Sequence, residues 1–179
     1  MTAETDIAAI DDSGANTAGE VRTALTSVLE RADSAIGCSL TKSSDQTVPT
    51  ATHTAITFDG EDYDDGGMHN NSTNTSRITI PTGEGGVYVF TGSAEIEQLD
   101  DGKHILVYFR KNGTTALDGR GRYWAGSNNV YPSPTFSKIV KLSAGDYVEL
   151  MVEHSQGSDL SVRASADGTS FTCEKLRAA

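Results

Sequence analysis

The sequence has little positive charge, and this shortage argues against one large class of function. Among its 179 residues, 14 Lys and Arg stand against 25 Asp and Glu, which gives a formal net charge of -11 at pH 7. Proteins that bind nucleic acid neutralise the phosphates with clusters of Lys and Arg. We therefore expect no nucleic-acid partner.

Long apolar runs are also missing. No stretch approaches the roughly 18 consecutive apolar residues that a transmembrane helix needs. The first residues, MTAETDIAAIDD, are acidic and polar, whereas a signal peptide begins basic and continues apolar. We therefore expect no membrane partner, and we expect the protein to be made and assembled in a cytoplasm.

Cysteine is scarce, and no catalytic motif is present. Cys38 and Cys173 form no CxxC pair, which excludes a zinc ribbon and a dithiol redox motif. The four histidines are scattered, and none falls in an HExxH or comparable arrangement. We expect a protein that is not an enzyme and needs no cofactor.

One helical segment stands near the start of the chain. Thr17 to Glu20 matches a capping box, and Gly37 is the predicted stop signal. Apolar residues recur between them at helical spacing. The residues expected on this attachment face are Val21, Leu25, Val28 and Leu29, followed by Ala32 and Ala35.

This apolar stripe spans only about two heptads, too little for a free coiled coil. The helix must therefore dock, either on its own domain or, as we favour, on a larger assembly. Residues 1–16 lack periodicity and predict an arm that is extended or is disordered until bound. Residues 1–37 are thus interpreted as an N-terminal arm and helix that attach the chain to a partner.

From Cys38 onward the apolar period changes to two, which predicts an all-β domain over residues 38–179. The clearest strands are Arg77 to Ile80, Gly86 to Glu97, Ile105 to Lys111, Phe136 to Leu142, Tyr147 to His154, Leu160 to Ala164 and Phe171 to Leu176. Ile105 to Phe109 is apolar on both faces. Because a sandwich buries only one face of each sheet, this second apolar face suggests a subunit interface.

Four motifs follow one another in the β region: ITIPTGEGGVYVFTGSAEI, HILVYFRKNGT, VKLSAGDYVELMVEH and FTCEKL. Their distinctive residues are Pro81, Gly86, Tyr88, Asn112, Gly113, Leu142, Gly145, Asp146 and Val148. In this order the motifs resemble the C1q and tumour-necrosis-factor-like jelly roll, over about residues 38–177. The resemblance implies a ten-stranded jelly-roll sandwich that assembles as a homotrimer, with sheet faces meeting along a threefold axis.

Two further segments resemble parts of tailed-bacteriophage structural proteins. ITFDGEDYDDGGMHNNSTNTSRITIP looks like the phage version of this module, and DIAAIDDSGANTAGEVRTALTSVLERA looks like the adaptor by which fibres and spikes attach to a virion. The resemblance implies a non-enzymatic virion structural protein, a capsid decoration, head fibre or spike. It would be anchored on capsid or tail proteins through residues 1–37 and assembled in the host cytoplasm. The alternative is a carbohydrate- or receptor-binding adhesin, such as a tail-fibre tip.

In a jelly roll the first and last strands are antiparallel neighbours, so the resemblance predicts that Cys38 and Cys173 lie close together. Whether they form a disulfide stays an open question, because a bacterial cytoplasm would leave thiols reduced.

An acidic run offers a candidate calcium site. Its possible ligands are Asp62, Asp64 and Asp65, which stand beside Asp59 and Glu61 and before two glycines. Carboxylates on a Gly-rich loop supply the oxygen ligands that calcium prefers. The spacing is not that of an EF-hand, and we favour a solvated loop.

An aromatic segment, GRGRYWAGSNNVYPSPTF, offers a candidate binding site for a glycan of the host surface. Its residues are Arg122, Tyr123, Trp124 and Tyr131. Aromatic rings beside Arg and Asn suit the apolar face and the hydroxyls of a sugar. Packing in a sandwich or trimer core would use the same residues, and we favour packing.

Overall fold

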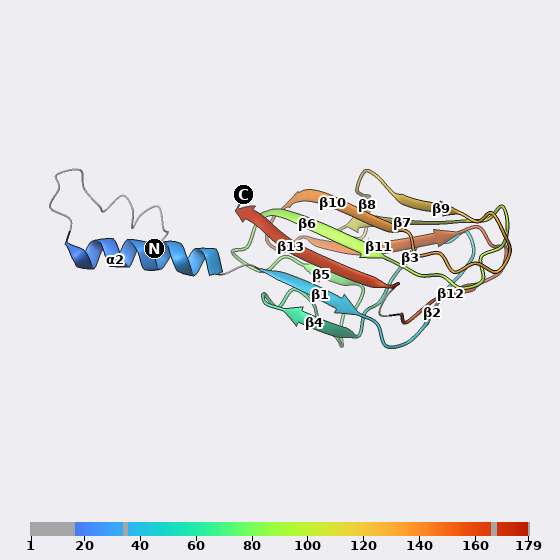
Figure 1. Cartoon of the computed structure of the whole chain (residues 1–179), viewed down its shortest axis with the longest axis horizontal. Coiled ribbons are helices and arrows are strands. Elements are labelled where there is room, and N and C mark those ends of the chain that lie inside the picture. Colours follow the sequence, from blue (N-terminus) through green and yellow to red (C-terminus); the bar gives the residue numbers. More distant parts are fainter. Residues whose placement is uncertain (1–16, 34–35, 166–167, 179) are drawn as a thin grey trace. The chain divides into compact units, whose positions relative to one another are not determined.

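The computed structural model describes residues 17–33, 36–165 and 168–178 (Figure 1). The chain divides into two units, and the second begins at Ile36. Helix α2 (Ala18–Asp33) belongs to the first unit, and all strands belong to the second. Among the described residues, no helix is long and apolar enough to cross a membrane.

Helix α2 begins at the predicted capping box. The Thr17 amide donates to Glu20 Oε2 at 2.7 Å, and the Glu20 amide donates to Thr17 Oγ1 at 3.3 Å. The predicted stop signal is wrong, because the helix ends at Asp33 and Gly37 is the first residue of a strand. The arm expected over residues 1–16 and the side chain of Leu29 lie outside the described part of the chain.

The described part of the second unit contains thirteen strands. They are β1 (Gly37–Thr41), β2 (Gln46–Val48), β3 (Thr54–Ala55), β4 (Gly60–Asp64), β5 (Arg77–Thr79), β6 (Gly86–Ser93), β7 (His104–Lys111), β8 (Thr115–Ala116), β9 (Gly121–Trp124), β10 (Thr135–Leu142), β11 (Tyr147–His154), β12 (Leu160–Val162) and β13 (Ser170–Ala178). The seven predicted strands are confirmed. The resemblance implied ten strands; the higher number includes very short segments such as β2, β3 and β8.

The strands form two main sheets that pack face to face (Figure 1). One sheet has the order β10-β6-β13-β1-β4. The other has the order β3-β11-β7-β8, with β5 also paired to β11 and β9 to β7. The first strand pairs antiparallel with the last, as the jelly-roll resemblance implied. A short ladder of β2 and β12 stands apart from both sheets.

Aromatic rings fill the space between the sheets. Phe109 of β7 lies 6.0 Å from Phe90 of β6, 5.6 Å from Phe171 of β13 and 5.2 Å from Phe136 of β10, measured between ring centroids. Gly92 of β6 allows this close approach, since a Cβ there would lie 3.1 Å from Phe109 Cε1. The core therefore joins both sheets through side chains far apart in sequence.

The second apolar face of β7 is covered by the same chain. Leu106, Tyr108 and Met151 form a small cluster on this outer face, and Ala55 of β3 packs against it. Leu106, Tyr108 and Met151 are at most 6% exposed in the single chain. The inference that this face is a subunit interface is therefore wrong, because groups of the same chain cover it: the His53 ring and the Arg120 guanidinium lie 5.6 and 5.3 Å from the Tyr108 ring centroid.

Hydrogen bonds and an ion pair connect two predicted turns, Asn112–Gly113 and Ala144–Asp146. Asn112 and Gly113 both have positive φ, 52° and 71°, as a tight turn after β7 requires. The carboxylate of Asp146, in the next turn, accepts hydrogen bonds from Lys111 Nζ, Asn112 Nδ2 and the Ser143 amide. Burial alone would raise the pKa of Asp146, but these donors lower it to about 2.

Candidate functional site

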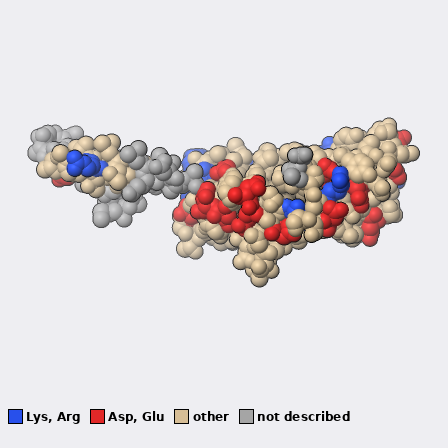
Figure 2. Space-filling model, turned by 60° about the horizontal axis from the view of Figure 1, so that its bottom comes forward, with Lys and Arg blue, Asp and Glu red and all other residues tan. Residues whose placement is uncertain are grey.

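The acidic run forms a strand and not the solvated loop that we favoured. Residues Gly60–Asp64 are β4, which pairs antiparallel with β1 at the edge of the five-stranded sheet. Figure 2 shows Asp and Glu gathered on the forward face of the domain, over the region of β4. Pairing with β1 satisfies the backbone groups along one side of this edge strand despite its charged side chains.

The carboxylates of this run are engaged within the chain. Asp64 accepts hydrogen bonds from the amides of Met68 and His69 at 2.8 and 3.0 Å, and Asp62 accepts one from Ser39 Oγ at 3.1 Å. In the part of the chain that the structure describes, no group of three or more His, Cys, Asp or Glu could hold a metal ion. The structure therefore does not bring Asp62, Asp64 and Asp65 together as a calcium site.

The aromatic candidate site is divided between two faces of a sheet. In the register of β9 on β7, Tyr123 lies opposite Ile105 and Trp124 lies opposite His104. Successive residues of a strand point to opposite faces, and Ile105 belongs to the core. Tyr123 therefore points to the inner side and Trp124 to the outer side, so these two rings cannot contact the same sugar.

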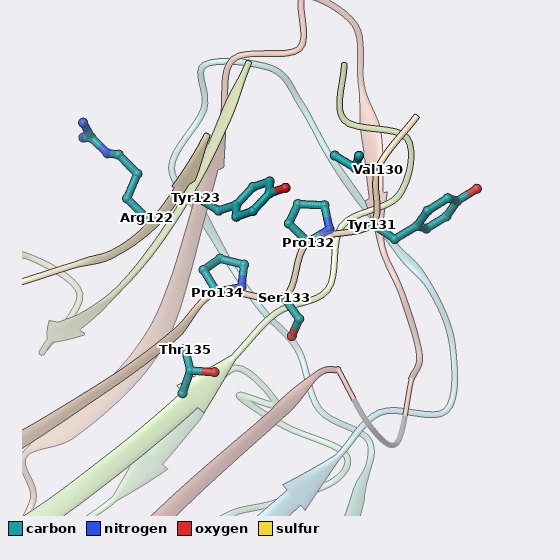
Figure 3. A pocket seen from close by; sticks show the side chains of 8 residues that line it. All are labelled: Arg122, Tyr123, Val130, Tyr131, Pro132, Ser133, Pro134 and Thr135. Carbon is teal, nitrogen blue, oxygen red and sulfur yellow. The ribbon is translucent and has the colours of Figure 1, made fainter. Parts of the chain in front are cut away.

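Tyr123 and Tyr131 line an open depression at the edge of the sandwich. It has a volume of about 400 Å³, and residues 130–135 form its other wall. Figure 3 shows the Tyr123 ring directed toward Pro132, while Arg122 points away from the depression. The guanidinium of Arg163 lies 5.4 Å from the Tyr131 ring centroid. The Tyr123 ring, Pro132 and Pro134 thus form the apolar part of the depression's lining, and Ser133 and Thr135 add hydroxyls.

Trp124 instead joins a polar group that the sequence did not reveal. Its ring centroid lies 4.8 Å from that of His104. The Nε2 atom of His104 lies 3.1 Å from Glu153 Oε2, across the pairing of β7 with β11. Trp124 is 58% exposed, whereas Glu153 is 9% exposed. Strand register alone brings these three residues together, so the sequence indicated Trp124 but not its contact with His104 and Glu153.

A second exposed surface is the outer face of the five-stranded sheet. Tyr88 and Phe90 of β6 are fully buried, so Val87 and Val89 face outward. Ile139 of β10 lies directly opposite Val89 and is 60% exposed. This outer face therefore carries branched apolar side chains that the single chain does not cover.

The two cysteines lie opposite each other in the five-stranded sheet. Cys38 of β1 is the register partner of Cys173 of β13, which agrees with the prediction that they lie close together. Both are free and buried thiols. Burial raises the pKa of both thiols, and the nearby Glu174 carboxylate raises it further.

The arrangement of the strands is that of a C1q/TNF-like jelly roll. A TNF structure, Eiger from S. frugiperda, matches with a TM-score of 0.60 at 12% identity, over 81% of this chain and 94% of that chain. The globular domain of zebrafish complement 1qA matches with a TM-score of 0.56 at 15% identity, over 80% and 99%. Murine APRIL at pH 5.0 matches with a TM-score of 0.59 at 15% identity, over 79% and 99%.

No family model matches the sequence, and no curated protein matches it. At these identities, the likeness to solved structures establishes the fold and nothing further. The C1q/TNF-like jelly roll expected from the sequence motifs is confirmed.

The state of the two cysteines can be measured directly. We expect a maleimide reagent at pH 8 to label the native full-length protein slowly, since the thiols are buried and protonated. After unfolding in guanidinium chloride without reductant, two thiols per chain should react, as intact-mass measurement would show. An unfolded chain that reacts only after reduction would instead reveal a disulfide.

Proposed function

We propose that this chain is a non-enzymatic structural protein of a tailed-bacteriophage virion, a homotrimeric knob held at the virion surface by its N-terminal segment. The trimer is inferred from an apolar patch of Val87, Val89 and Ile139 on the outer face of the five-stranded sheet, which Lys141 and Glu174 border. The resemblance of the sequence motifs to phage proteins supports the virion location.

A cyclic trimer needs two different surfaces on each chain, because a heterologous contact joins unlike patches around the ring. The domain offers two. One is the outer face with Val87, Val89 and Ile139, and the other is the edge with Tyr123 and Tyr131. In our proposal the edge of one protomer packs on the outer sheet face of the next.

Short side chains favour such a contact. Thr91 and Ser137 lie on the same outer face, where their hydroxyls are 2.9 Å apart, and Thr172 is the partner of Thr91 on β13. A row of small residues lets another chain approach the sheet closely. The surrounding branched residues then supply apolar area for burial.

Helix α2 is the proposed attachment segment. Val21, Leu25 and Val28 are 39%, 58% and 43% exposed, which is unusual for three apolar residues at helical spacing. A partner in the capsid or tail would cover this stripe. The N-terminal segment would thereby fix each knob to the particle, while the jelly roll remains at the surface.

The trimer can be tested by placing a charge on the outer sheet face. We expect wild-type full-length protein to have the mass of a trimer by light scattering at micromolar concentration. Ile139→Asp should weaken each contact by about 2 kcal/mol or more, roughly 30-fold, because it places a carboxylate in an apolar interface. It should then elute as a monomer.

Trp124→Ala is the matched control, because Trp124 is as exposed as Ile139 but belongs to the other sheet. This variant should remain a trimer. A wild-type monomer, or an Ile139→Asp variant that stays trimeric, would contradict the proposed interface.

Attachment can be tested by complementing a phage that lacks the protein. Deletion of residues 1–36 should leave a folded knob that is absent from purified virions. Leu25→Asp should cause the same loss, because it charges the apolar stripe, whereas Thr26→Asp, one position off the stripe, should be incorporated normally. Equal incorporation of the deleted form would refute attachment through this segment.

A further inference from the structure

The outer face of the six-stranded sheet carries an exposed aromatic ring on a rigid strand. Trp124 is the only tryptophan of the chain, and β9 holds its backbone against β7. Its side chain is 58% exposed. An indole that is fixed from below and open above offers a flat apolar platform to a ligand.

Polar groups fixed within the sheet stand beside this platform. The His104 amide donates to Ser155 Oγ at 3.0 Å, and its ring lies between Trp124 and the Glu153 carboxylate. The first bond holds the His104 backbone, and the contact with Glu153 orients the imidazole beside the indole before any ligand arrives. Such preorganised groups lose little conformational freedom on binding.

Arg122 supplies an unused positive charge next to the indole. It lies two residues before Trp124 on β9, so both side chains leave the same face of the strand, about 7 Å apart along it. Arg110 and Arg163, in contrast, are paired with Glu149 and Glu95. Within the described ranges, the guanidinium of Arg122 has no hydrogen-bond or ion-pair partner.

We propose that Trp124, Arg122 and the His104–Glu153 pair bind an acidic saccharide. The C–H face of a sugar ring stacks on the indole, and an anionic group on the sugar accepts hydrogen bonds from the planar guanidinium of Arg122. His104 and Glu153 form hydrogen bonds with the hydroxyls at the side of the sugar ring. A base of single-stranded nucleic acid could also stack on Trp124, but the net charge of -11 opposes a polyanionic backbone.

This site goes beyond the proposed structural role and does not depend on it. Tyr123, in the proposed trimer contact, points to the inner side of β9, whereas Trp124 points to the outer side, so we expect assembly to leave the indole open. A trimer would present three copies, and weak single-site affinity would then be multiplied by avidity. The failure of attachment or of trimer formation would leave the site itself unaffected.

The sole tryptophan reports directly on the test. The full-length protein is screened on an array of acidic and neutral oligosaccharides, and the acidic oligosaccharide bound most strongly is titrated while Trp124 emission is recorded. We expect acidic saccharides to bind, with a saturable change in emission. Arg122→Gln should weaken binding by about 10-fold or more, since a charge-assisted hydrogen bond is lost.

On the array, Trp124→Ala should abolish binding. Arg22→Gln, which makes the same change as Arg122→Gln at an exposed position of helix α2, should bind as wild type. Thermal unfolding followed by circular dichroism verifies that each variant is folded. If Trp124→Ala does not fold, the result for Arg122→Gln decides. The proposal is overturned if the array shows no binding, if neutral sugars bind equally, or if both variants bind normally. Equal or tighter binding of a single-stranded oligonucleotide would also overturn it.

Discussion

The domain depends on the antiparallel pairing of its first strand with its last. Strand β13 lies between β1 and β6, so it joins two parts of the five-stranded sheet that have no other strand in common. The same strand places Phe171 against Phe58, Phe90 and Phe109 in the core. Because these contacts join residues far apart in the chain, the sheet and the core are completed together.

This pairing also creates two outer faces with different chemistry. On the five-stranded sheet, the alternation of β6 buries Tyr88 and Phe90 and turns Val87 and Val89 outward. On the six-stranded sheet, His53 and Arg120 pack on Tyr108 of the outer face, and Trp124 is exposed there beside polar groups. We propose the first face as a protein contact and the second as a ligand surface.

The sequence predicted the features that depend on neighbouring residues. Period-two alternation located seven strands, the Thr17–Glu20 box located the helix start, and Asn112–Gly113 located a turn. Strand β4 was missed because charged residues are poor strand formers, and only pairing with β1 stabilises it. The contact of His104 with Trp124 and Glu153 depends on strand register, which no local pattern specifies. The division of Tyr123 from Trp124, in contrast, follows from alternation and could have been predicted from sequence.

Hydroxyl-radical footprinting of the full-length protein tests most directly whether the two outer faces differ in solution. Ile139 and Trp124 are almost equally exposed in the single chain, at 60% and 58%. The oxidation rate of each is divided by its rate in the unfolded chain to remove intrinsic reactivity. We expect strong protection of Ile139 and little protection of Trp124. Equal protection of the two residues would contradict the assignment of the five-stranded sheet as the contact between chains.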